Sequence, residues 1–327
     1  MKLILSHTSA LDLIRELRWR HGDMRPASIR TLSDCACSLK DIRSIQIPAF
    51  DQSQEQLEVI VDSTKKSRQS KEHICHVLKS PLLTGMFCKV GRNAYVTSPE
   101  LTFIQMATRL ETIDLIRLGM ELCGTYAPCP YSDRFDNRPP VTEKERILSL
   151  CERAQGLHGS AAAARALRWV LDNSNSPAET ALVLLLCLPV RLGGYGFECP
   201  NMNPETPLGK RNSTMLGRQE KMRCDLHWVD QRVVVEYDSD QEHLSSQSAS
   251  QDAARRNVLG YKDIEVITVR KPMIESPRAF DSVAKQLARA LGRRLRPRDR
   301  EFTQARADLR IKLFPWLEAK RRGQWDD

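Results

Sequence analysis

Arg223-Cys-Asp-Leu-His-Trp-Val-Asp-Gln-Arg-Val-Val-Val-Glu-Tyr-Asp238 is the stretch that decides the fold of the C-terminal half. Polar and apolar residues alternate on both sides of the pair Asp230-Gln231. This alternation predicts two short strands that are joined by a tight turn. If the pair forms the turn, the numbers of any two facing residues add up to 461.

This register divides the expected hairpin into an apolar side and a polar side. The apolar pairs are Trp228 with Val233, Leu226 with Val235, and Cys224 with Tyr237. The polar side pairs His227 with Val234, Asp225 with Glu236, and Arg223 with Asp238. Carboxylates that face each other across a ladder repel by on the order of a few tenths of a kcal/mol. Clustered carboxylate oxygens are also the ligands that Mg²⁺ or Mn²⁺ prefers.

A purely structural interpretation of the hairpin also stands. Its polar side would simply be solvated at the edge of a sheet, with Arg223 neutralising Asp238. The pair Asp-Gln lacks the glycine that two-residue turns favour. One further turn residue would move Asp225 and Glu236 to opposite faces of the sheet.

The segments around the hairpin predict a mixed α/β core. Ser176-Pro-Ala-Glu179 opens an apolar helix over 180–188, and a helix is expected over 248–259. A strand over 264–270 follows, and another helix begins near Ser276. The order is therefore helix, hairpin, helix, strand, helix.

This succession resembles the very-short-patch-repair endonucleases and related bacterial nuclease-like domains of the PD-(D/E)xK restriction-endonuclease-like superfamily. The resemblance covers roughly residues 160–275. Four matches carry it: Ser-Pro-x-Glu at 176–179, Arg-x-Asp at 223–225, Val-Glu-Tyr-Asp at 235–238, and Asp-x-x-x-Arg at 252–256 followed by Leu259-Gly260.

The resemblance implies roles for particular residues. Asp225 and Glu236 correspond to the metal-binding acids, and Asp238 stands where many relatives carry the lysine of the motif. Glu179 is similar to a helix glutamate that points into the same site. Arg256 is similar to an arginine that approaches phosphate.

The remaining roles have structural alternatives. Since the motif lysine is missing, His243 is the candidate general base, because a neutral imidazole can accept a proton near neutral pH. A polar loop histidine is also often just a solvated residue. Glu179 with Ser176 and Pro177 is equally a helix capping box. Arg256 with Asp252 fits a salt bridge on a helix face.

Length and composition limit the number of domains and the class of protein. The chain has 327 residues, enough for two domains, and 41% of them are hydrophobic. No apolar run approaches the roughly 20 residues that span a bilayer, so we expect a cytoplasmic protein without a membrane partner. The ten cysteines are scattered, which predicts free, mostly buried thiols. A zinc site built from Cys35, Cys37, His73, Cys75 and His76 is a weaker possibility, because the spacings are unusual.

Positive charge is concentrated near the C-terminus. Residues 285–322 hold 13 Lys and Arg against four acids, a net +9 that equals the net charge of the whole chain. Such a segment beside a candidate nuclease predicts contacts with the DNA backbone. The arginines expected to bind nucleic acid are Arg256, Arg293, Arg294, Arg296, Arg298 and Arg300. A solvated helix, or one that binds an acidic protein partner, is the alternative.

The first 130 residues predict a separate α+β unit. Helices are expected over 8–18, from Ser98-Pro99 onward and over 111–123, with strands over 57–61 and 94–97. The unit resembles abortive-infection-type antitoxin domains from about Ser6 to Tyr126, mainly through Ser98-Pro-Glu100 and its helix. This part of the chain could therefore bind a protein partner. The turn-rich segment 127–140 is the natural boundary.

Together these features predict an α/β chain in which an N-terminal α+β domain precedes a restriction-endonuclease-like mixed sheet flanked by helices. The expected parts are 1–130 (antitoxin-like recognition or regulation), 131–160 (linker and connecting helix), 161–275 (nuclease-like core) and 276–327 (basic helical tail). The expected function is Mg²⁺- or Mn²⁺-dependent cleavage of DNA, in repair or in defence against foreign DNA. A non-cutting DNA-binding or antitoxin-like regulator, and a partner-binding protein, are the alternatives.

Overall fold

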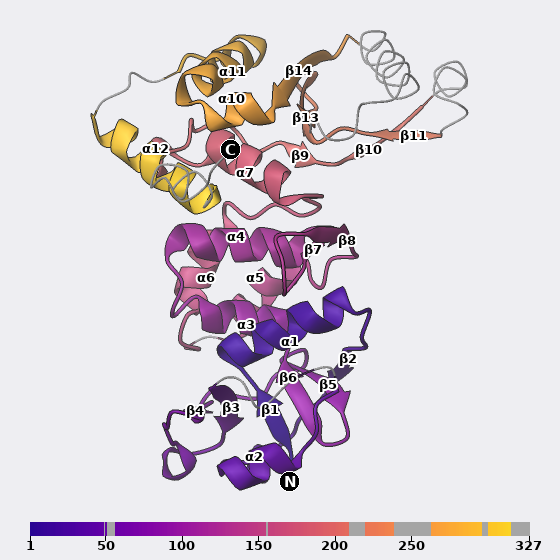
Figure 1. Ribbon diagram of the computed structural model, residues 1–327, viewed down its shortest axis with the longest axis vertical. Coiled ribbons are helices and arrows are strands. Elements are labelled where there is room, and N and C mark those ends of the chain that lie inside the picture. The colour runs from indigo at the N-terminus through magenta and orange to yellow at the C-terminus, as the bar shows by residue number, and fades with distance from the viewer. Residues whose placement is uncertain are drawn as a thin grey trace. The chain divides into compact units, whose positions relative to one another are not determined.

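The computed structural model (Figure 1) describes residues 1–48, 50, 56–154, 156–208, 220–238, 263–295 and 300–314. Its contacts divide the chain into two compact units, an N-terminal unit Met1–Asp172 and a C-terminal unit Asn173–Asp327. Each unit combines helices with β-sheet, which confirms the predicted mixed α/β class.

The N-terminal unit contains a six-stranded mixed sheet. Its order is β2-β5-β6-β1-β3-β4, with β1 parallel to β6 and β3 parallel to β4. The other neighbours are antiparallel. The strands are β1 (Leu3–Leu5), β2 (Arg25–Ala27), β3 (Leu57–Val61), β4 (His73–Val77), β5 (Phe87–Gly91) and β6 (Ala94–Thr97). Every residue of the central strands β1 and β3 is buried, as expected for strands covered on both faces.

Helices α1, α3 and α4 begin within one residue of where the sequence predicts them. Ser98 caps α3 through its hydroxyl, which accepts a hydrogen bond from Leu101 N–H, and Pro99 occupies the first turn. The helices are α1 (His7–Trp19), α2 (Leu39–Ser44), α3 (Pro99–Met106), α4 (Thr112–Cys123), α5 (Lys144–Arg153) and α6 (Ser160–Leu167), with the short 3₁₀ helix η1 (Thr64–Lys66). In Figure 1, α1 lies beside α3, with which it makes direct contacts.

The boundary between the units differs from the one predicted at 127–140. That segment instead forms a small hairpin of β7 (Tyr126–Pro128) and β8 (Phe135–Asn137), and Tyr131 donates a hydrogen bond to Glu16 of α1 (2.6 Å). Beyond it, α5 and α6 pack on α3 and α4. The predicted linker 131–160 is therefore part of the N-terminal unit, and the division falls after Asp172. The proline-rich composition marked a tight surface hairpin and not a domain end.

A four-stranded mixed sheet lies at the centre of the C-terminal unit. Its order is β14-β13-β12-β9, with β13 parallel to β14 and antiparallel to β12. A separate antiparallel pair is formed by β10 and β11. The strands are β9 (Asn201–Met202), β10 (Glu205–Pro207), β11 (Lys221–Arg223), β12 (Leu226–Trp228), β13 (Val233–Asp238) and β14 (Glu265–Arg270).

Helices pack on this sheet. Helix α7 (Pro177–Cys187) contacts β13, and α10 (Lys271–Glu275) and α11 (Pro277–Ala290) contact β14. Helix α12 (Arg300–Leu313) packs on α7 and on the 3₁₀ helix η2 (Val190–Leu192). Among the described residues, no helix is both long and apolar enough to cross a bilayer.

Candidate functional site

The hairpin of β12 and β13 has the predicted register. Leu226 pairs with Val235, His227 with Val234 and Trp228 with Val233, so facing residues add up to 461. The residues 229–232 between the strands form turns, and Arg232 has a positive φ of 55°. The alternating pattern was therefore sufficient to fix these three pairs.

The chain departs from the predicted ladder at Asp225. Strand β12 begins only at Leu226, and Cys224 packs with Met222 and Val234 and not on the side of Val235 and Tyr237. The carboxylate of Asp225 accepts a hydrogen bond from the backbone N–H of Tyr237 (2.7 Å). Because a side-chain oxygen takes over a ladder bond, the chain bends here and the alternation of faces is lost. The predicted cross-strand placement of Cys224 was wrong for this reason.

The partner predicted for Asp238 was also wrong. Arg223 lies in β11 and donates to Glu205 of β10 (2.6 Å), to which Lys221 is also bonded. Asp238 is held by Arg270 (3.2 Å), which stands directly opposite it in the parallel strand β14. The acid is thus neutralised from the other neighbouring strand.

Glu179 lies at the start of α7 and is buried. It forms the capping box that its sequence predicts: Ser176 accepts from Glu179 N–H (3.1 Å), and the Ser176 hydroxyl donates back to the carboxylate (3.1 Å). The carboxylate also accepts from Asn175 N–H (3.0 Å) and from the Asn203 amide (2.6 Å). Burial raises the pKa of Glu179 above its ordinary value, and these hydrogen bonds offset that effect only in part.

Asn203 joins the predicted acids to one another. Its side chain contacts Glu179, and its backbone N–H donates to the carbonyl of Asp225 (2.9 Å). Asp225 in turn contacts Tyr237, the neighbour of Glu236. Glu179, Asp225 and Glu236 are therefore brought to the same end of the hairpin. The sequence pattern gave no sign of Asn203, which adopts a positive φ of 48° that asparagine tolerates well.

The structure describes only some of the remaining predicted site residues. His243, Arg256, Arg296 and Arg298 lie outside the described residues. Arg300 opens α12, Arg294 is exposed, and Arg293 is exposed beside Glu198 (2.9 Å).

Part of the basic tail is built into the C-terminal unit. Arg306 is largely buried and bonded to Asp281 and to the Tyr195 hydroxyl. Arg310 is buried and donates to the carbonyl of Ile274. These two arginines hold α12 on the unit and are not available to a nucleic acid, so the tail is only partly a solvated basic surface.

A second cluster, which the sequence did not predict, lies in the N-terminal unit. Among the described residues, one group of three or more His, Cys, Asp or Glu side chains brings all its ligand atoms within 4.8 Å of one another. It consists of His7 at the start of α1, Glu58 in β3 and His76 in β4. His76 Nε2 lies 2.7 Å from Glu58 Oε2, and the two imidazole rings are 3.9 Å apart.

Arg109 completes this cluster from the turn after α3. Its guanidinium forms a bidentate ion pair with Glu58 (2.6 Å from Nη1 to Oε1) and also reaches the hydroxyl of Thr8 (3.2 Å). Burial acts to raise the pKa of Glu58, but the hydrogen bonds from His76 and Arg109 prevail and lower it to about 2. Burial, with the nearby His76 and Arg109, lowers the pKa of His7 to about 3.

The signal for this cluster was a glutamate inside the otherwise apolar strand Leu57-Glu-Val-Ile-Val61, every residue of which is buried. A buried acid requires a partner. Its partners are 51 residues before it and 18 and 51 residues after it, and no local pattern reveals such distant contacts.

Among the described residues, no cysteine belongs to a group of metal-ligating side chains, so the zinc site considered from the sequence is not formed. All ten cysteines are free, as the composition predicts, and the Cys75 thiol donates to the carbonyl of Cys37 (3.4 Å). His76 turns to Glu58 instead. Burial raises the pKa of Cys35 and Cys88 to about 11, so these thiols stay protonated near neutral pH.

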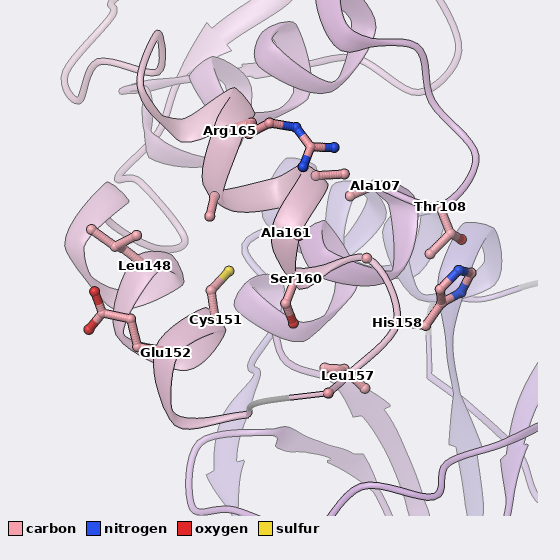
Figure 2. Close-up of a pocket in the computed structure, with 14 residues that line it drawn as sticks. Ala107, Thr108, Leu148, Cys151, Glu152, Leu157, His158, Ser160, Ala161 and Arg165 are labelled. Carbon is pink, nitrogen blue, oxygen red and sulfur yellow. The ribbon is translucent and has the colours of Figure 1, made fainter.

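A pocket of about 820 Å³ lies between the end of α3 and the helices α5 and α6 (Figure 2). More than half of its lining residues are Ala, Gly or Leu. Cys151 lines it, but burial raises the pKa of that thiol to about 11 and so removes its nucleophilic form. The pocket offers an apolar surface and little chemistry.

Comparison of the chain with protein-family models, with curated proteins and with solved structures found no significant match.

Proposed function

We propose that the C-terminal unit is a metal-dependent DNA endonuclease. The observation that supports this best is the chain of contacts from Glu179 through Asn203 to Asp225, and from Asp225 to the backbone beside Glu236. These contacts bring Glu179 of α7, Glu236 of β13 and Asp225, which lies just before β12, to one end of the hairpin. A cation bound at this end of the hairpin would offset the repulsion between these acids.

Asp225 and Glu236 would hold Mg²⁺ or Mn²⁺, because their carboxylate oxygens are hard ligands. When bound, such an ion polarises the scissile phosphate and lowers the pKa of the attacking water. Other residues of the chain would hold these acids in position. Tyr237 N–H fixes the Asp225 carboxylate, Glu179 holds Asn203 against Asp225, and Arg270 orients Asp238. Exposed arginines such as Arg294 would contact the DNA backbone.

A non-cutting DNA-binding protein on the same fold is the second candidate. The carboxylates of Glu179 and Asp238 both have protein partners, Asn203 and Ser176 for the first and Arg270 for the second. In addition, the carboxylates of Glu179, Asp225 and Glu236 do not form a group of three within 4.8 Å among the described residues. Both features suit a structural role for the acids.

The test is cleavage of supercoiled plasmid and of single-stranded DNA by the purified full chain, with Mg²⁺, Mn²⁺ or EDTA. Cutting should require a divalent ion, and Asp225→Asn and Glu236→Gln should each abolish it. Asn keeps an oxygen that can accept from Tyr237 N–H, so the hairpin should survive the first change.

Matched controls are Asp263→Asn and Glu265→Gln. They make the same chemical changes at exposed acids of the same unit, so they should cut like the parent. Cleavage by Asp225→Asn and Glu236→Gln at the parental rate would refute the proposal. DNA binding without cutting under every metal condition would favour the second candidate.

A further inference from the structure

The cluster of His7, Glu58, His76 and Arg109 has more polar groups than are needed to compensate the buried charge of Glu58. Glu58 is buried, with 5% of its side chain exposed, and the bidentate contact with Arg109 already compensates its charge. Two imidazole rings 3.9 Å apart are not needed for that purpose. Both imidazoles nevertheless lie close to the same carboxylate, which points to a role beyond charge compensation.

The two histidines are held in place by their surroundings. His7 has a positive φ of 49°, an uncommon conformation for histidine, and its backbone N–H donates to Gln105 (3.0 Å). Its Nδ1 lies 3.1 Å from the Ser6 hydroxyl. Glu58 is fixed at its backbone, where its N–H donates to the Ser9 hydroxyl (3.0 Å). Preorganised donors of this kind are typical of metal sites.

We propose that His7, Glu58 and His76 form a binding site for a divalent transition-metal ion of the Zn²⁺ class. Two imidazole nitrogens and one carboxylate oxygen are a ligand set that Zn²⁺ accepts, and three protein ligands leave a fourth position for water or an anion. This site is independent of the acids in the C-terminal unit.

The geometry needs only a small adjustment. The ligand atoms lie within 4.8 Å of one another, whereas ligands around tetrahedral zinc are about 3.4 Å apart. The contact between His76 Nε2 and Glu58 Oε2, now 2.7 Å, would be replaced by two bonds to the ion. The imidazole would then carry its proton on Nδ1.

Arg109 has a distinct role in this arrangement. It would keep its bond from Nη1 to Glu58 Oε1 and so orient the carboxylate, while the ion would replace the bond from Nη2 to Oε2. Its Nη2 lies 3.5 Å from His76 Nε2, which places a positive charge beside the fourth position. An anion such as phosphate or a carboxylate is therefore the ligand that this position favours.

The test uses the full chain in the Asp225→Asn/Glu236→Gln background, which keeps ions away from the C-terminal acids. The protein is stripped with a chelator and titrated with Zn²⁺ by calorimetry and with Co²⁺ by visible absorption. We expect one ion per chain, d–d bands of a nitrogen and oxygen ligand set, and a melting temperature that rises with the ion.

The variants are His7→Asn, Glu58→Gln and His76→Asn. Asn tolerates the positive φ at position 7, so that protein should fold even if Glu58→Gln does not. Each should weaken binding by about 100-fold or more, beyond the 10–100-fold that outer-shell changes cause. His158→Asn is the matched control at an exposed histidine of the same unit and should bind like the parent.

Four results would overturn the proposal. These are no binding of either ion, unchanged affinity in the His7 and His76 variants, an equal loss in the His158 control, and absorption by thiolate-to-cobalt charge transfer. The last would place the ion on cysteines instead.

Discussion

Glu58 and Glu179 are both buried carboxylates, and their surroundings act on their charge in opposite directions. Glu58 contacts a guanidinium and an imidazole, and its pKa is lowered to about 2. Glu179 contacts a hydroxyl, an amide and a backbone N–H, and its pKa is raised because burial outweighs these neutral donors. At Glu179, the hydrogen bonds from neutral donors do not fully offset the loss of hydration of the charge.

This difference makes a prediction for Glu179. Glu179→Ala removes the acceptor for Asn175 N–H and Asn203, so it should lower the free energy of unfolding by about 1–3 kcal/mol. Glu179→Gln keeps an acceptor oxygen and carries no charge, so at neutral pH it should be at least as stable as the parent. Urea denaturation of the three proteins measures both effects.

The pH dependence gives the control. A raised pKa means that folded Glu179 holds its proton more firmly than the unfolded chain does. Its stabilising contribution is complete below the unfolded pKa, near 4.3, and is lost as pH rises through the folded pKa. The advantage of Glu179→Gln over the parent should therefore grow between about pH 4 and about pH 7. A constant difference, or a loss equal to that of Glu179→Ala, would contradict this account.

At the scale of elements, α12 is held on its unit by a close approach to Gly193. A Cβ at Gly193 would lie 2.3 Å from the carbonyl oxygen of Ala305, and Gly193 has a positive φ of 88°. Gly196 also has a positive φ, 73°, but a Cβ there would meet nothing within 4 Å. A comparison of substitutions at the two glycines can therefore distinguish the cost of backbone strain from the cost of steric overlap.

We therefore expect Gly196→Ala to cost about 1–2 kcal/mol from backbone strain alone. Gly193→Ala should cost a further 1–3 kcal/mol or so, because the backbone of α12 must shift. Thermal and urea unfolding of both variants provide the measurement. Equal losses would show that α12 does not pack against Gly193 in solution.

The elements also show what the sequence could and could not predict. Alternation fixed the register of Leu226–Trp228 against Val233–Val235, since a shift by one residue would expose the apolar side. It failed at Asp225, because a side chain that replaces a backbone acceptor leaves no trace in the pattern. Capping signals placed the starts of α3 and α7 correctly, as Ser98 and Ser176 act locally.

At the scale of the whole molecule, contacts between residues far apart in the sequence could not be predicted. The helices α5 and α6 belong to the N-terminal unit because of what they pack on, which composition does not reveal. Likewise, an arginine count could not show that Arg306 and Arg310 are used within the C-terminal unit. Deleting the tail would consequently remove packing as well as charge, so substitutions are the better test of DNA binding.

The last prediction concerns the salt dependence of DNA binding. Replacing five arginines of the tail by Gln should flatten the plot of log affinity against log salt by about 0.9 for each phosphate that the protein no longer neutralises, because fewer counterions are released. The five are Arg293, Arg294, Arg296, Arg298 and Arg300. The slope is measured by fluorescence anisotropy with a labelled duplex at several salt concentrations.

A control of equal charge decides whether these positions matter or only the net charge. Five exposed cations of the N-terminal unit are replaced by Gln in the same way: Arg25, Arg30, Lys40, Arg43 and Arg92. Both variants lose five charges, so a general effect of net charge would change both slopes alike. If the tail contacts phosphates directly, only the first variant should show the flatter slope. Equal slopes in the two variants, or a slope unchanged from the parent in the first, would remove the tail from the DNA interface and favour an acidic protein partner for it.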